Sequence, residues 1–152
     1  MKKIVNIGIV GFGIVGEGVY RLIKNNADTI ALRSGIEIKI KTICDLKTAE
    51  IKEKITGINI TDKWSDITGD SDIDIVVEVI GGISPAREII IESLRKGKNV
   101  VTANKKLLAE DGAEILQTIV ETGNSIGFEA AYKINCRYTE RNNKLHSYPD
   151  GR

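Results

Sequence analysis

The sequence predicts an α/β fold built on a doubly wound parallel sheet. Short apolar segments alternate with amphipathic segments from residue 4 to residue 128, and strands separated by helices are joined by right-handed crossovers into a parallel sheet. A glycine-rich segment, GFGIVG, lies where the first apolar segment meets the first amphipathic one. This strand–glycine–helix order is typical of a fold that binds its ligand at the end of its first strand.

The first three segments are regular. Residues 4–10 are apolar and β-branched, as in a buried parallel strand. Apolar residues then recur at helical spacing and predict a helix from Ile14 to about Asn25. Alternating polarity over 36–43 predicts a second strand with one face partly solvated.

The middle of the chain is less regular. We expect a short helix over 48–55, a short strand over 59–61 and a turn of helix near Trp64. The run DIVVEVI (74–80) then predicts another buried strand.

The last predicted elements are bounded by clear signals. Ser84 and Pro85 predict the start of a helix, with the serine as cap and the proline in the first helical position. Gly97 ends that helix. Strands over 99–102 and 125–128 flank a helix over 107–122.

Composition restricts the function. The chain has 152 residues, enough for one ordinary domain, and its formal net charge is +1, which gives no electrostatic reason to expect a nucleic-acid or membrane-surface partner. Two separated cysteines and one histidine predict neither a disulfide framework nor a metal site. No apolar run approaches the ~20 residues that span a bilayer, so we expect a cytoplasmic protein with reduced thiols.

The glycines form the pattern Gly11-x-Gly13-x-x-Gly16. In a dinucleotide-binding turn, Gly11 would let the chain leave the strand tightly, Gly13 would let a pyrophosphate approach the backbone, and Gly16 would let the helix lie close to the sheet. The positive end of the helix would then face the phosphates. The alternative is a glycine-rich turn that binds nothing.

Other candidate residues follow three strands. Asp45 ends the second strand, farther from Gly16 than the usual ~20 residues, and would bind the ribose 2′-hydroxyl of NAD; the alternative is a solvated turn aspartate. Gly81 and Lys105 follow the strands predicted over 74–80 and 99–102, so both are carried to the edge of the sheet where ligands bind. Glu78 lies inside an apolar strand, and we expect it to be paired in a structural role or to lie at a domain junction.

Four segments together resemble homoserine dehydrogenase: residues 7–19, 74–90, 97–115 and 127–131. The resemblance implies an NAD(P)-binding Rossmann fold and the interconversion of L-homoserine and L-aspartate 4-semialdehyde with NAD or NADP, in threonine and methionine biosynthesis. The family is homo-oligomeric.

The resemblance also assigns residues. It implies that cofactor-binding residues are Gly11, Phe12, Gly13, Ile14, Val15, Gly16, Asp45, Gly81, Thr102 and Lys105. Lys105, in the Ala-Asn-Lys motif, is also the catalytic candidate, beside the nicotinamide and the substrate. Many NADP-using members have arginine where this chain has Cys44, which favours NAD, although Lys47 is near enough to help a 2′-phosphate.

The resemblance stops near residue 131. We therefore expect an NAD(P)-binding domain over 1–131, a poorly ordered tail of aberrant sequence over 132–152, and no substrate and dimerisation domain, which would leave the chain inactive alone. His146, in that tail, has no nucleophile partner and is not expected to be catalytic. Two alternatives are a stand-alone NAD(P)-sensing module and a non-functional fragment with an apolar surface near Ile126 and Phe128.

Overall fold

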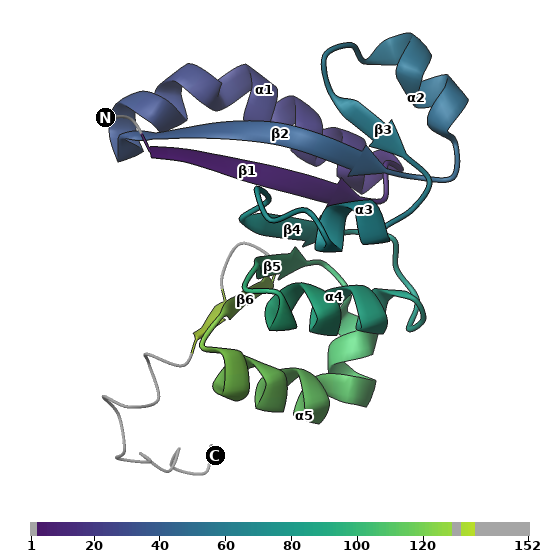
Figure 1. Cartoon of the computed structure of the whole chain (residues 1–152), viewed down its shortest axis with the longest axis vertical. Coiled ribbons are helices and arrows are strands. Elements are labelled where there is room, and N and C mark those ends of the chain that lie inside the picture. Colours follow the sequence, from purple (N-terminus) through teal and green to yellow (C-terminus); the bar gives the residue numbers. More distant parts are fainter. Residues whose placement is uncertain (1–2, 129–131, 136–152) are drawn as a thin grey trace, which may run out of the picture.

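The computed structural model describes residues 3–128 and 132–135, which form a seven-stranded sheet in the order β3-β2-β1-β4-β5-β6-β7 (Figure 1). The strands are β1 (Lys3–Val10), β2 (Ile36–Cys44), β3 (Asn59–Thr61), β4 (Ile75–Glu78), β5 (Asn99–Thr102), β6 (Ser125–Phe128) and β7 (Tyr132–Asn135). The first six pair in parallel, and β7 is antiparallel to β6. The order 3-2-1-4-5-6 is that of a doubly wound dinucleotide-binding sheet, so the predicted fold class is confirmed.

Helices cover both faces of this sheet. They are α1 (Ile14–Ser34), α2 (Thr48–Lys54), α3 (Ser65–Thr68), α4 (Ala86–Arg95) and α5 (Lys105–Thr122). In Figure 1, α1 lies along β1 and β2, whereas α4 and α5 lie together beside the strands from β4 onward. Neighbouring residues of one strand point to opposite faces, so Ile9 packs in the core under α1 and α2 while Val10 packs in the core with α4 and α5.

Helix α1 is longer than the sequence predicted. It runs to Ser34 rather than ending near Asn25, and Gly35 ends it with φ +70° and an amide that donates to the carbonyl of Ala31. Asn26, next to the predicted end, donates from its side chain to the carbonyl of Leu22, one turn earlier (2.8 Å), which a helix accommodates.

Helix α4 begins without the predicted serine cap. Pro85, not Ser84, is the residue at its N-terminal boundary, and no side chain in the described part of the chain caps it. The amide of Arg87 donates to the carbonyl of Ile83 (2.8 Å), so the turn before the helix already satisfies a donor that a serine side chain would take.

The expected tail begins differently from the prediction. Residues 132–135 form β7, with Tyr132 opposite Phe128 and Asn135 opposite Ser125. Strand β6 would otherwise present an unpaired edge, and a short antiparallel strand satisfies its backbone groups. The rest of the tail, 136–152, with Cys136 and His146, lies outside the described residues.

The described helices show no membrane-spanning segment: none of them is both long enough and apolar enough to cross a bilayer.

Candidate dinucleotide-binding site

The glycine turn connects β1 to α1 in close contact with the strands beside it. Gly11 has φ +100° and donates its amide to the carbonyl of Cys44 (2.8 Å). A Cβ on Gly16 would lie 2.0 Å from the carbonyl oxygen of Gly11, so only glycine lets α1 start this close to the turn.

Gly13 has a different environment from the other two fingerprint glycines. A Cβ built there meets nothing within 4 Å among the described residues, and none of their side chains caps α1 at this position. The backbone of Gly13 therefore borders open space at the positive end of a helix, which is where an anionic ligand is stabilised.

Asp45 lies against the same turn. The strand pairing places Cys44 opposite Val10, so the chain leaves β2 beside the point where it leaves β1. One carboxylate oxygen of Asp45, Oδ2, accepts a hydrogen bond from the amide of Phe12 (2.7 Å), and Oδ1 accepts one from the amide of Lys47 (2.9 Å). The predicted acidic residue is thus built into the turn that it was expected to face.

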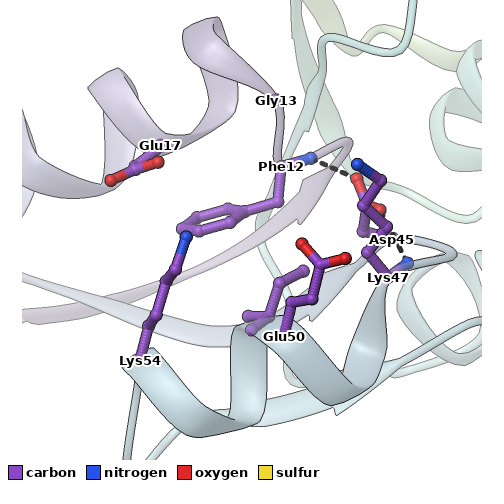
Figure 2. A pocket seen from close by; sticks show the side chains of 8 residues that line it. Phe12, Gly13, Glu17, Asp45, Lys47, Glu50 and Lys54 are labelled. Carbon is purple, nitrogen blue, oxygen red and sulfur yellow. Dashed lines mark hydrogen bonds between the residues drawn. The ribbon is translucent and has the colours of Figure 1, made fainter.

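A pocket of about 190 Å³ opens between this turn and α2. Figure 2 shows the ring of Phe12 extending from the turn into the space between α1 and α2, with Glu50 and Lys54 rising from α2. The rings of Phe12 and Tyr20 form a T-shaped pair (5.8 Å between centroids). The pocket is lined by Phe12, Gly13, Glu17, Asp45, Lys47, Glu50, Ile51 and Lys54. Carboxylates therefore outnumber ammonium groups in this lining.

Cys44 stands where an arginine would favour NADP. Its side chain is buried, and that burial, with the nearby charge of Asp45, raises the pKa of the Cys44 thiol to about 11. A buried neutral thiol offers no positive charge to a 2′-phosphate.

The ends of β4 and β5 form a second part of the same sheet edge. Glu78 is 0% exposed, and its Oε2 accepts a hydrogen bond from the hydroxyl of Thr102 (2.6 Å). Thr102 is itself buried, and its hydroxyl is turned toward Glu78; its role in cofactor binding stays a prediction. The expectation that Glu78 is paired agrees with these contacts.

Asn104 was missed by the sequence analysis. Its side-chain Nδ2 donates to the carbonyl of Gly82 (2.5 Å), and its Oδ1 accepts from the amide of Leu107, which makes it the N-cap of α5. The signal was present, because asparagine just before a helix is a preferred cap. The catalytic candidate Lys105 is the next residue, exposed in the first turn of α5.

The structure brings the predicted residues to one edge of the sheet in two groups. One group surrounds the ends of β1 and β2: Gly11, Phe12, Gly13, Ile14, Val15, Gly16 and Asp45. The other follows β4 and β5: Gly81, Thr102 and Lys105. The pairing of Val10 with Glu78 joins the two groups, and Ile14 (94% exposed) and Val15 (54% exposed) extend from the edge. The roles of the individual residues in binding stay predictions.

The fold and the glycine turn define an α/β domain of the dinucleotide-binding class. A family model described as the NAD-binding domain of homoserine dehydrogenase matches residues 11–129. The chain therefore belongs to the homoserine dehydrogenase family and carries the NAD-binding domain of that family. The match confirms the family predicted from the sequence and the class of ligand, a nicotinamide dinucleotide.

Individual relatives agree with this assignment. A homoserine dehydrogenase of Neisseria gonorrhoeae is 38% identical over 129 residues, which are 85% of this chain and 30% of that protein. The crystal structure of a homoserine dehydrogenase from Thiobacillus denitrificans superposes with a TM-score of 0.79 at 38% identity, covering 85% of this chain and 30% of that one. The crystal structure of the homoserine dehydrogenase of S. aureus superposes with a TM-score of 0.78 at 32% identity, covering 87% of this chain and 33% of that one. This chain thus spans about a third of the length of these relatives.

Proposed function

We propose that this chain binds NAD at the carboxyl edge of its sheet and forms the cofactor-binding part of an enzyme that interconverts L-homoserine and L-aspartate 4-semialdehyde. The observation that carries the proposal is the arrangement at Gly13. Its backbone faces open space at the start of α1, and Asp45 lies on the same turn. Open backbone at a helix N-terminus with an acid beside it fits a pyrophosphate and its neighbouring ribose.

The lining of the pocket favours NAD over NADP. The Asp45 carboxylate already accepts two backbone amides, and its remaining lone pairs can accept ribose hydroxyls. A 2′-phosphate would bring about two further negative charges toward Asp45, Glu17 and Glu50, and in the described lining Lys47 and Lys54 oppose them. Repulsion between like charges therefore disfavours NADP.

Lys105 is the residue that we assign to the reactive end of the cofactor. It follows β5 directly, at the edge where Gly81 follows β4. A bound nicotinamide supplies the hydride chemistry of the family's reaction. The Lys105 ammonium would hold the carboxamide or the substrate in position, since fixed orientation of the reacting groups lowers the barrier.

We propose the reaction for the family's full-length protein and cofactor binding for this chain. Because the matched part is the NAD-binding domain, about 30% of the Neisseria gonorrhoeae relative, we expect this domain by itself to bind the cofactor without turning over homoserine. A cytoplasmic location and a homo-oligomeric state of the complete protein stay predictions.

Calorimetric titration of the purified chain with NADH and with NADPH tests the proposal. NADH should bind more tightly, and NADH at about 100 times its Kd should raise the free energy of unfolding by about 2.7 kcal/mol. Failure of both nucleotides to bind or to raise the melting temperature would overturn the proposal. Oxidation of homoserine by this chain at the rate of a full-length relative would refute the proposed division of function.

A further inference from the structure

Glu78 is a buried acid that the dinucleotide fingerprint does not explain. It ends β4, is 0% exposed, and has both oxygens engaged as acceptors. The hydroxyl of Thr102 donates to Oε2 (2.6 Å), and the amide of Ile80 donates to Oε1 (2.9 Å). Burying a carboxylate is costly without such hydrogen bonds, and here they come from the ends of two adjacent strands.

The contacts of Glu78 continue into a closed ring. The hydroxyl oxygen of Thr102 accepts from the amide of Asn104 (3.0 Å), and the Asn104 side chain donates to the carbonyl of Gly82 (2.5 Å). Gly82 and Ile80 belong to the loop that leaves β4, so the ring returns to Glu78 through the backbone. The loops after β4 and β5 are therefore tied together by three side chains.

We propose that Glu78 is a positioning residue for the nicotinamide-binding end of the site. The ring that it closes fixes Asn104, which caps the amide of Leu107 and so sets where α5 begins. Lys105 is the first residue of α5, and Gly81 lies within the loop that the ring encloses. Glu78 thus positions both Lys105 and Gly81 without contacting the ligand itself. This inference rests on the proposed function.

The chemistry of the ring favours a carboxylate at position 78 over a neutral amide. A carboxylate offers two acceptor oxygens and no donor, which matches the two donors that face it. A glutamine of the same size offers one oxygen and one NH₂ group. An NH₂ group facing the amide of Ile80 would oppose two donors. An NH₂ group facing Thr102 would force that hydroxyl to accept, so its own proton would lose its buried acceptor.

Glu78→Gln and Thr102→Val test the inference through two ligands that differ at one end. NADH carries the nicotinamide, whereas ADP-ribose keeps the adenosine, the pyrophosphate and the second ribose. We expect each variant to weaken NADH binding about tenfold, the loss typical of one buried hydrogen bond, and to leave the Kd of ADP-ribose within about twofold. Thr102→Ser keeps the hydroxyl and should restore most of the lost NADH affinity.

Thr68→Val is the matched control for Thr102→Val. Thr68 is also fully buried, and its hydroxyl also donates to a carboxylate, that of Glu92 (2.8 Å), but it belongs to α3, outside the site. Thr68→Val should leave the affinities for NADH and ADP-ribose unchanged. Equal losses for the two ligands in the Thr102→Val or Glu78→Gln protein would indicate a general structural role and overturn the inference, as would unchanged NADH binding.

Amide hydrogen exchange in the ligand-free protein provides a measurement that does not depend on the proposed function. The amides of Ile80 and Asn104 should exchange about tenfold faster in the Thr102→Val protein than in the Thr68→Val protein, while the amide of Gly11 keeps its rate. Equal amide exchange rates at Ile80 and Asn104 in the two proteins would contradict the proposed hydrogen-bonded ring, even if the wild type bound no nucleotide. Should Glu78→Gln fail to fold, Thr102→Val carries both measurements.

Discussion

The amide of Phe12 donates a 2.7 Å hydrogen bond to Oδ2 of Asp45, which joins the turn after β1 to the turn after β2. The other oxygen of Asp45 binds the amide of Lys47. The acid after the second strand therefore has two functions to separate: it holds the glycine turn in place, and it faces the pocket where we propose that the ribose binds.

Substitution of Asp45 separates these two functions. Asp45→Asn keeps one acceptor oxygen for a backbone amide, and Asp45→Ala removes both. We expect the alanine variant to lose about 1–3 kcal/mol of unfolding free energy in urea, because two amides lose a charged acceptor, and the asparagine variant to lose less. Both should reduce the preference for NADH over NADPH in calorimetry. A preference equal to that of the wild type would contradict the ribose assignment.

Gly13 and Gly18 form a matched pair for testing where the pyrophosphate lies. An added Cβ meets nothing within 4 Å at either position, so the fold accommodates alanine at both. Gly13→Ala should weaken NADH binding at least about tenfold, because the methyl group occupies the space that the phosphates need. Gly18→Ala, within exposed helix, should stabilise the protein by about 0.5–1 kcal/mol and leave the Kd unchanged. Equal NADH affinities for the two variants would place the phosphates elsewhere.

Substitution of Gly16 should lower the stability of the ligand-free protein, because the close contact is part of the fold itself. A methyl group there would lie 2.0 Å from the carbonyl oxygen and 2.9 Å from the carbonyl carbon of Gly11, which are backbone atoms and cannot give way as a flexible side chain can. We expect Gly16→Ala to cost about 3 kcal/mol or more, since α1 must move away from the turn. A thermal melt without nucleotide measures this loss, and a melting temperature within about 2 °C of wild type would show that α1 can move without strain.

The positions of the glycine turn and of Asp45 could be predicted from local sequence, whereas their roles in binding stay predictions. Gly11, Gly13 and Gly16 were predictable because a strand, a tight turn and a helix follow each other directly, and Asp45 because it ends the next strand. The ring of Glu78, Thr102 and Asn104 was not, because its members come from two strands whose register only the folded sheet determines.

Two local predictions failed because tertiary contacts decided them. The first helix was predicted to end near Asn25, yet α1 continues to Ser34 along β2. The strand at 132–135 has no apolar period of its own and pairs with β6 in the register Tyr132–Phe128. Side-chain patterns carry little information about either event.

The acid sensitivity of the fold should depend on the ion pair of Lys41 with Asp70 (2.7 Å). The hydrogen bond from Lys41 lowers the pKa of Asp70 below its ordinary value of 3.8. The unfolded chain therefore binds a proton at higher pH than the folded one, and the stabilisation is present above about pH 4 and is lost as the pH falls through the lowered value. Urea midpoints measured between about pH 5 and pH 2 should fall less steeply for Asp70→Asn and for Lys41→Met than for wild type. If the urea midpoints of the variants fell with pH as steeply as those of the wild type, other carboxylates would be responsible for the loss of stability in acid.

The thiol of Cys44 should report on the opening of the site. Burial, assisted by the charge of Asp45, raises its pKa from 9.0 to about 11, which reduces the thiolate population at pH 8 about a hundredfold. In a Cys136→Ser protein, so that Cys44 is the remaining thiol, reaction with a disulfide reagent should be at least about a hundredfold slower than in the same protein unfolded by urea. The carbonyl of Cys44 accepts the amide of Gly11, so NADH bound at the turn should slow the reaction further. Rapid labelling of the folded protein, or labelling that NADH leaves unchanged, would show that the end of β2 opens independently of the glycine turn.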